Sequence, residues 1–190
     1  MRRLPYFAIA TAALGLVSAP LLADGQGEMM QDKPHHMHGM KHGDGHVPIY
    51  AEDLLDLYYS KLEKRIDLPV APANVSLSPD ATITRLAFGS CNHQLRPQDF
   101  WQTIAGTDPD LFLFIGDNNY GDQGWDGDAR LTSLRKAYEV QAATPELAAF
   151  RARVPMMITW DDHDYGFNDG GGSFAFRGWS EKIFETFWGS

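Results

Sequence analysis

Three short segments of the sequence carry side chains that could bind a metal ion or transfer a proton. They hold the following residues: Cys91 and His93; Asp117 and Tyr120; Asp161, Asp162, His163 and Asp164. Carboxylate and phenolate oxygens suit a highly charged metal ion, and thiolate and imidazole are also metal ligands. Each segment alone has an ordinary explanation, such as a buried thiol or a turn with a capping aspartate. The three together favour a metal site if the fold brings them to one place.

The sequence around these segments predicts such a fold. Apolar runs at residues 83–88, 111–115 and 155–160 predict three β-strands, and each run ends just before one of the three segments. Helical patterns lie between the runs, and a last helix is expected at residues 179–188. The resulting β-α-β-α-β order predicts an α/β fold with parallel strands. Because the carboxyl ends of parallel strands share one sheet edge, we expect the three segments to meet there.

The net charge of the sequence limits the kinds of molecule that the protein is expected to bind. The formal net charge is −9, so we expect no nucleic-acid-binding surface. Many acidic residues fall within residues 117–128 and 161–169. These are either solvated acidic loops or carboxylates that cations hold close together. The single cysteine, Cys91, cannot form an internal disulfide, and a metal would hold it as thiolate.

The N-terminus predicts export. Residues 1–23 combine Arg2 and Arg3, an apolar core from Phe7 to Val17 and a plausible cleavage site after Ala23, which is the pattern of a secretory signal peptide. The apolar core is short for a transmembrane helix, so we expect no membrane anchor after cleavage. The predicted location is periplasmic or secreted.

Two further segments precede the first strand. Residues 24–50 are rich in His and Met, which predicts a disordered linker. This linker is either inert or an accessory site for copper, nickel or zinc, formed by His35, His36, His38, His42 and His46. Residues 51–81 predict an amphipathic helix, residues 52–66, followed by a loop. The stripe expected to face the core is Leu55, Tyr58, Leu62 and Ile66.

The three segments resemble the motifs of a known superfamily. Residues 116–120, Gly-Asp-x-x-Tyr, resemble the second motif of the calcineurin-like metallophosphoesterases, in a tyrosine form similar to that of purple acid phosphatases. Residues 162–164, Asp-His-Asp, are similar to the third motif. Residues 91–93, Cys-x-His, have the spacing of the first motif, Asp-x-His.

One branch of this superfamily is matched more specifically. Residues 88–91, 116–122 and 160–166 together resemble the alkaline phosphatase D family, called PhoD-like, in order and spacing. The resemblance covers residues 82–190. It implies a hydrolase of phosphate monoesters or diesters with an αββα two-sheet sandwich and a binuclear site of ferric iron and calcium.

The resemblance also implies a set of metal ligands. They would be Cys91, Asp117, Tyr120, Asp161, Asp162 and Asp164. Cys91 and Tyr120 would bind the ferric ion, Asp117 would bridge to the other metal, and Asp162 would bind that second metal. Paired metals can clamp the phosphoryl oxygens and neutralise the charge that builds up in the transition state.

The same resemblance implies residues that act on the substrate. His163 and Asp162 would be catalytic, with His163 near the phosphate as leaving-group acid or transition-state stabiliser. Asn118, His163 and Asn168 would contact the substrate, a phosphate ester. The role of His93 stays open, because a cysteine stands where the superfamily motif has its aspartate.

The resemblance extends only to the N-terminal half of the family's fold. The superfamily takes further ligands from strands after the third motif, whereas this sequence stops at Ser190 after one more helix. We therefore expect a truncated domain that a missing C-terminal half or a complementing chain would complete. An alternative of a different class is a periplasmic metal-binding or scavenging protein that acts through residues 35–46.

Overall fold

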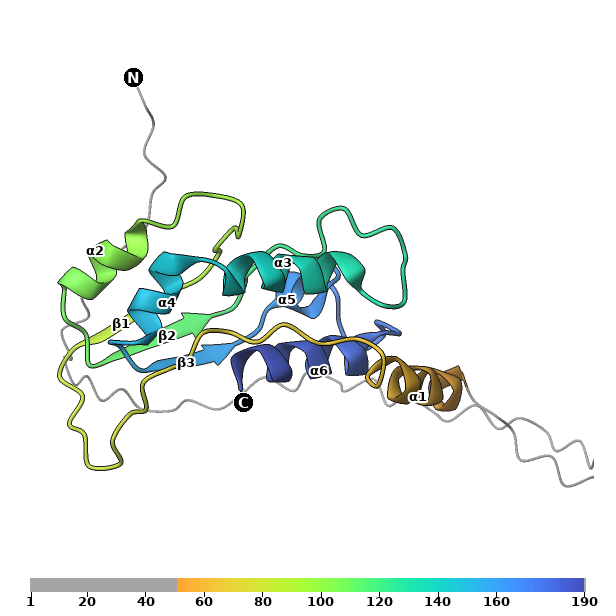
Figure 1. Cartoon of the computed structure of the whole chain (residues 1–190), viewed down its shortest axis with the longest axis horizontal. Coiled ribbons are helices and arrows are strands. Elements are labelled where there is room, and N and C mark those ends of the chain that lie inside the picture. The colour runs from red at the N-terminus through yellow and green to blue at the C-terminus, as the bar shows by residue number, and fades with distance from the viewer. Residues whose placement is uncertain (1–50, 190) are drawn as a thin grey trace, which may run out of the picture. The chain divides into compact units, whose positions relative to one another are not determined.

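The computed structural model describes residues 51–189 (Figure 1). The predicted signal peptide and the His/Met-rich segment, with its accessory histidines, lie outside the described residues, as does Ser190. The described elements are, in order, α1 (Ala51–Leu62), β1 (Leu86–Gly89), α2 (Phe100–Gly106), β2 (Leu111–Ile115), α3 (Thr132–Ala142), α4 (Pro145–Arg151), β3 (Met156–Thr159), α5 (Asp162–Tyr165) and α6 (Arg177–Trp188).

The three strands form one parallel sheet in the order β1-β2-β3. Helix α2 connects β1 to β2, and α3 and α4 connect β2 to β3, so the predicted α/β order and the parallel pairing are confirmed. In the register, Phe88 pairs with Leu113, and Leu113 pairs with Met157. All three strands therefore end at the same edge of the sheet.

The first strand begins later than predicted. The apolar run predicts a strand at residues 83–88, but β1 covers Leu86–Gly89. The backbone N–H groups of Thr84 and Arg85 each donate to Oδ2 of Asp110 at 2.8 Å, and the Thr84 hydroxyl donates to the same oxygen at 2.8 Å. For these two N–H groups, the Asp110 carboxylate thus takes the place of the carbonyl groups of a neighbouring strand.

One face of the sheet carries the hydrophobic core. Phe112 and Phe114 of β2 point to this face, where the ring of Trp101 in α2 lies 5.4 Å and 5.7 Å from theirs. Trp188 of α6 lies 6.0 Å from Phe114 on the same side. Burial of such large aromatic rings is a major stabilising contribution. It fixes α2 and α6 against the sheet, and with them the loops that leave its edge.

The opposite face of the sheet is apolar and exposed. Side chains alternate along a strand, so Leu86 and Phe88 of β1, Ile115 of β2 and Met157 of β3 point away from the core. Their exposed fractions are 49%, 43%, 47% and 59%. Parallel sheets are ordinarily covered on both faces.

Helix α1 differs from the prediction in its end and in its buried face. It ends at Leu62, and hydrogen-bonded turns continue to Ile66. The tyrosine that faces the core is Tyr59, whose ring stacks on Trp179 at 5.0 Å, whereas Tyr58 is 38% exposed. Both tyrosines fit the helical period, because neighbours on one face are three or four residues apart.

Helices α2, α4 and α5 are short. Helix α4 begins at Pro145, and the hydroxyl of the preceding Thr144 donates to the carbonyl of Val140 instead of capping the helix. Helix α6 matches the predicted last helix. No helix in residues 51–189 is long and apolar enough to cross a membrane.

Candidate metal centre

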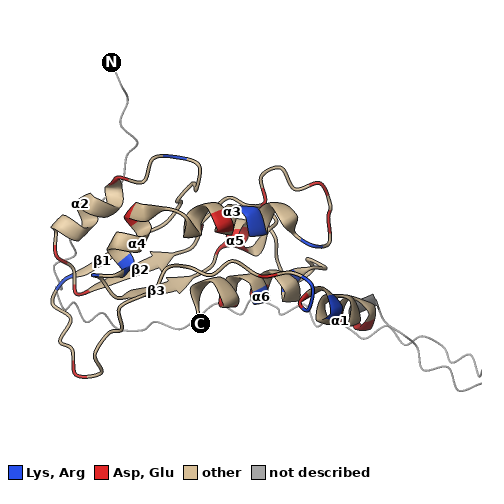
Figure 2. Cartoon of the chain, in the orientation of Figure 1, with Lys and Arg blue, Asp and Glu red and all other residues tan. Residues whose placement is uncertain are grey.

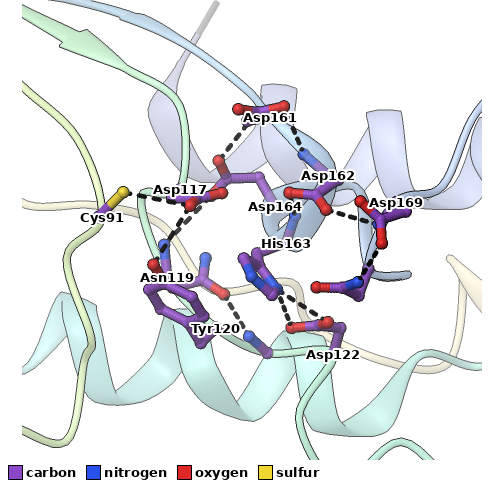
Figure 3. A network of polar contacts seen from close by, with 12 residues as sticks. Cys91, Asp117, Asn119, Tyr120, Asp122, Asp161, Asp162, His163, Asp164 and Asp169 are labelled. Atoms are coloured by element: carbon purple, nitrogen blue, oxygen red, sulfur yellow. Dashed lines mark hydrogen bonds and ion pairs between the residues drawn. The ribbon is translucent and has the colours of Figure 1, made fainter.

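The predicted metal ligands lie at the carboxyl ends of the three strands, in the segments that follow them (Figure 3). Cys91 follows β1, Asp117 and Tyr120 follow β2, and α5 with Asp162 follows β3. Figure 2 shows that acidic residues recur in the loop between β2 and α3. The structure therefore brings all three predicted segments to one sheet edge.

Gly116 allows two of these segments to approach closely. It leaves β2 with a φ of +93°, a conformation that glycine adopts without steric cost. A Cβ at this position would lie 2.6 Å from the Cβ of Asp161. The loop after β2 and the start of α5 thus touch at a point where only glycine fits.

Asp117, Asp162 and His163 form the centre of the site. Each offers one ligand atom, and these atoms all lie within 4.8 Å of one another. Oδ1 of Asp117 is buried without a hydrogen-bond partner. A buried carboxylate oxygen without a donor is costly unless a cation meets it. The donor set and this unpartnered oxygen both fit a metal ion.

The other carboxylate oxygen of Asp117, Oδ2, accepts hydrogen bonds from the two side chains expected to bind the ferric ion. The Cys91 thiol donates to Oδ2 at 3.3 Å, and the Tyr120 hydroxyl donates to it at 3.2 Å. Burial, the hydrogen bond with Cys91 and the charge of Asp117 all raise the pKa of Tyr120 above its usual value. A metal cation would act in the opposite direction, because positive charge favours phenolate and thiolate.

His163 is held by Asp122, which was not among the predicted site residues. Nδ1 of His163 lies 2.9 Å from both carboxylate oxygens of Asp122, whose side chain is only 7% exposed. Burial lowers the pKa of His163, but the hydrogen bond and the charge of Asp122 outweigh burial, and the net shift of the pKa is upward. Because Nδ1 is engaged, Nε2 is the nitrogen left for a ligand. Asp122 is the last residue of the segment 116–122 that resembles the PhoD-like motif, and this position is the sequence signal that could have identified it.

Asp162 is oriented by backbone donors. Its Oδ1 accepts a hydrogen bond from the N–H of His163 at 2.9 Å, and its Oδ2 accepts one from Asp169 at 2.5 Å. Burial opposes ionisation of Asp162, but the Asp169 hydrogen bond, the charge of His163 and the His163 hydrogen bond prevail and lower its pKa. The carboxylate is therefore ionised at neutral pH, as a metal ligand must be.

Asp164 and Asn118 are fully buried beside this centre. The Asp164 carboxylate accepts hydrogen bonds from the N–H groups of Asn118, Asn119 and Asp161 and from the Asn118 amide, at 2.8–3.2 Å. The Asn118 amide also donates to the carbonyl of Thr159 at 2.8 Å. Burial raises the pKa of Asp164 to about 7 in spite of these donors. Asn118 and Asp164 thus join the loop after β2 to β3 and α5, and most of their polar atoms take part in these hydrogen bonds.

Asp161 and Asn168 lie at the exposed rim of the site. Oδ1 of Asp161 accepts from the N–H of Asp162 at 3.0 Å and caps α5. The Asn168 amide donates to Asp169 at 2.7 Å. Among the described residues, Asp161 does not belong to the group of three close ligand atoms.

Residues 86–169 match the family model described as PhoD-like phosphatase. This part of the chain is similar to the PhoD-like phosphatase family. The matched range begins at the first residue of β1 and ends at Asp169, so it contains all three strands and the three segments at their ends. No match to the chain was found among curated proteins or among solved structures.

The similarity to PhoD-like phosphatases gives the site a chemical context. PhoD-like phosphatases are metal-dependent, and the close group of Asp117, Asp162 and His163 is a candidate metal site. The family indicates phosphoesterase activity with a phosphate ester as substrate.

Proposed function

We propose that this protein is an exported, metal-dependent phosphoric ester hydrolase that acts on phosphomonoesters or phosphodiesters. The observation that carries the proposal is the buried, unpartnered Oδ1 of Asp117, in a group whose three ligand atoms lie within 4.8 Å of one another. The PhoD-like match supports the reaction class. The signal-peptide pattern of residues 1–23 supports export to the periplasm or the medium.

The proposed site is binuclear, with ferric iron and calcium. Cys91 and Tyr120 would hold the iron, because both donate to the same oxygen of Asp117 and a metal cation stabilises thiolate and phenolate. Asp117 would lie between the two ions, and Asp162 would bind the second. Further candidate ligands are Asp161 and Asp164.

The chain's own residues would bind the ester and move its protons. When bound, the metal ions supply positive charge that polarises the phosphoryl group. In this proposal His163 is protonated and does not bind a metal; held through Nδ1 by Asp122, it would give its Nε2 proton to the leaving oxygen or donate a hydrogen bond to a phosphoryl oxygen. Asn168 is exposed at the rim, where a substrate could reach it, whereas Asn118 supports the site from within.

The proposed fold of the complete enzyme is a two-sheet sandwich. The exposed apolar face formed by Leu86, Phe88, Ile115 and Met157 is a surface that a second sheet would cover. A C-terminal half or a complementing chain would supply that sheet.

The test is hydrolysis of a chromogenic phosphomonoester and of a bis-phosphodiester, with iron and calcium supplied. Asp117→Asn and Asp162→Asn should abolish most of the activity, since each removes a negative charge from the metal site. The matched control is Asp126→Asn, an exposed aspartate of the loop after β2. A folded, metal-loaded protein that hydrolyses neither ester, or an unchanged rate in Asp117→Asn, would contradict the proposal.

A second candidate function rests on the spacing of His35, His36, His38, His42 and His46, which suits periplasmic binding or scavenging of copper or nickel. Competition with a weak chelator would decide, using the full chain and a variant in which the five histidines are alanine. Equal metal uptake by both would remove this function.

A further inference from the structure

Four consecutive residues after β1 each contact the loop after β2. Cys91 donates through Sγ to the Asp117 carboxylate at 3.3 Å, and the N–H of residue 92 donates to the Asp117 carbonyl at 2.8 Å. The His93 ring stacks on the Tyr120 ring, with centroids 5.4 Å apart and planes at 16°. Oε1 of Gln94 accepts from the N–H of Tyr120 at 2.9 Å. Residues 91–94 thus form a clasp, two contacts on Asp117 followed by two on Tyr120.

The tautomer of His93 in this clasp is set by its neighbour Leu95. Nδ1 of His93 accepts a hydrogen bond from the backbone N–H of Leu95 at 3.3 Å. A neutral imidazole that accepts through Nδ1 carries its proton on Nε2, which leaves no free lone pair for a metal ion. Among the described residues, His93 also lies outside the close group of ligand atoms. The spacing Cys-x-His therefore does not describe two metal ligands here.

The side chain of Tyr120 needs neighbouring contacts to hold it in position. It contacts two imidazoles: the His163 ring lies 4.2 Å away on a tilted approach, and the His93 ring stacks on it in a nearly parallel arrangement. Its hydroxyl must stay within reach of Asp117, 3.2 Å away, to serve the site. A side chain with two free torsions keeps such a position only if its ring is packed on its faces.

We propose that His93 and Gln94 are positioning residues that hold Tyr120 against Asp117, His93 by stacking on its ring and Gln94 by fixing its backbone. This proposal rests on the proposed function for the part that concerns metal binding by Tyr120. It explains why a histidine follows Cys91 at this spacing without acting as a ligand. This role depends on the aromatic face of His93 and does not depend on its ring nitrogens.

The decisive comparison is His93→Phe with His93→Ala. Phenylalanine keeps a flat ring and removes both nitrogens, so it preserves the stack and destroys any metal ligand. We expect His93→Phe to keep iron affinity and kcat close to the parent values, and His93→Ala to lose roughly tenfold in iron affinity, as removal of an outer support typically does. Gln94→Glu, which keeps an acceptor, should resemble the parent, and Gln94→Leu should resemble His93→Ala.

A readout that needs neither metal nor activity is ¹⁹F NMR of the full chain labelled with 3-fluorotyrosine. The chain has seven tyrosines, and the Tyr120 signal is assigned as the one missing from Tyr120→Phe. We expect this signal to shift and broaden in metal-free His93→Ala and to stay sharp in His93→Phe. Broadening in both variants, or in neither, would overturn the proposal.

The iron affinities of the His93 variants separate the remaining outcomes. Loss of iron from His93→Phe as large as that from His93→Ala would identify His93 as a ligand and reject the stacking role. If the protein hydrolyses no phosphate ester under any metal condition, the proposed function fails, and the ¹⁹F comparison still decides whether the clasp exists.

Discussion

At the scale of single residues, Asp122 shows how a loop side chain can set the chemistry of a neighbour. It contacts Nδ1 of His163 with both oxygens at 2.9 Å, and both side chains are largely buried. Such a carboxylate fixes the tautomer and raises the basicity of the imidazole. The proposed role of His163 would therefore depend on Asp122.

We expect Asp122→Asn to reduce kcat/KM, and to reduce it more for alkyl phosphates than for nitrophenyl phosphate. An alkoxide is a poor leaving group and needs the proton of His163, whereas nitrophenolate leaves without it. The measurement is kcat/KM for esters whose leaving groups differ in pKa. Asp126→Asn is the control in the same loop, and an equal loss for both ester types would show that His163 does not act as the acid.

Gly116 can be tested against a glycine with the same backbone conformation. Gly116 and Gly124 have φ values of +93° and +87°, but a Cβ at Gly124 meets nothing within 4 Å. We expect Gly124→Ala to lower the free energy of unfolding by about 1 kcal/mol, from backbone strain alone. Gly116→Ala adds the clash with Asp161 and should lower it by about 3 kcal/mol or more.

Urea unfolding of both variants measures this difference. Equal losses for the two glycines would show that the loop after β2 and the start of α5 do not approach each other as closely as described.

At the scale of elements, the Asp110 carboxylate, just before β2, binds the backbone N–H groups ahead of β1. Its Oδ2 accepts three hydrogen bonds from Thr84 and Arg85, and those from the two backbone N–H groups, Arg85 first, hold the pKa of Asp110 below its usual value. A group whose pKa is lowered on folding stabilises the folded state above its unfolded pKa. That stabilisation disappears as the pH falls through the pKa that the group has in the folded state.

We therefore expect Asp110→Asn to be less stable than the parent at neutral pH, with a difference that shrinks as the pH falls below about 4. Urea midpoints at several pH values measure it. Asp108→Asn is the control, because Asp108 forms an exposed ion pair with Arg85, a type of contact that contributes little. A difference between Asp110→Asn and the parent that does not change with pH would contradict this role.

The elements also show what the sequence can and cannot predict. Apolar runs predicted three parallel strands, and the short segments after them predicted which side chains meet at the sheet edge, because topology alone carries strand ends to one edge. The predicted start of the first strand was wrong because the carboxylate of Asp110, just before β2, binds the N–H groups of Thr84 and Arg85 ahead of β1. Asp122 and Gln94 lie in loops, where no periodicity marks a contact, and only three-dimensional packing reveals their partners.

At the scale of the whole described region, the exposed apolar face of the sheet is the dominant feature. It includes Phe88, 43% exposed, and Met157, 59% exposed, on two strands that flank Leu113. Exposed apolar patches on a sheet favour association. We expect the chain to self-associate at micromolar concentrations and Met157→Lys to shift it towards monomer.

Analytical ultracentrifugation measures this association. Leu95→Lys is the control, because Leu95 is 71% exposed but lies outside the sheet. A monomeric parent, or an equal effect of both substitutions, would show that this face does not drive association.

The central claim is that Cys91, Asp117 and Tyr120 hold a ferric ion at the edge of the sheet. The most direct measurement is the visible absorption spectrum of the iron-loaded protein, recorded together with its iron content. The account predicts a charge-transfer band that loses most of its phenolate part in Tyr120→Phe, and loss of bound iron in Asp117→Asn. A colourless protein with full iron occupancy, or an unchanged band in Tyr120→Phe, would contradict it.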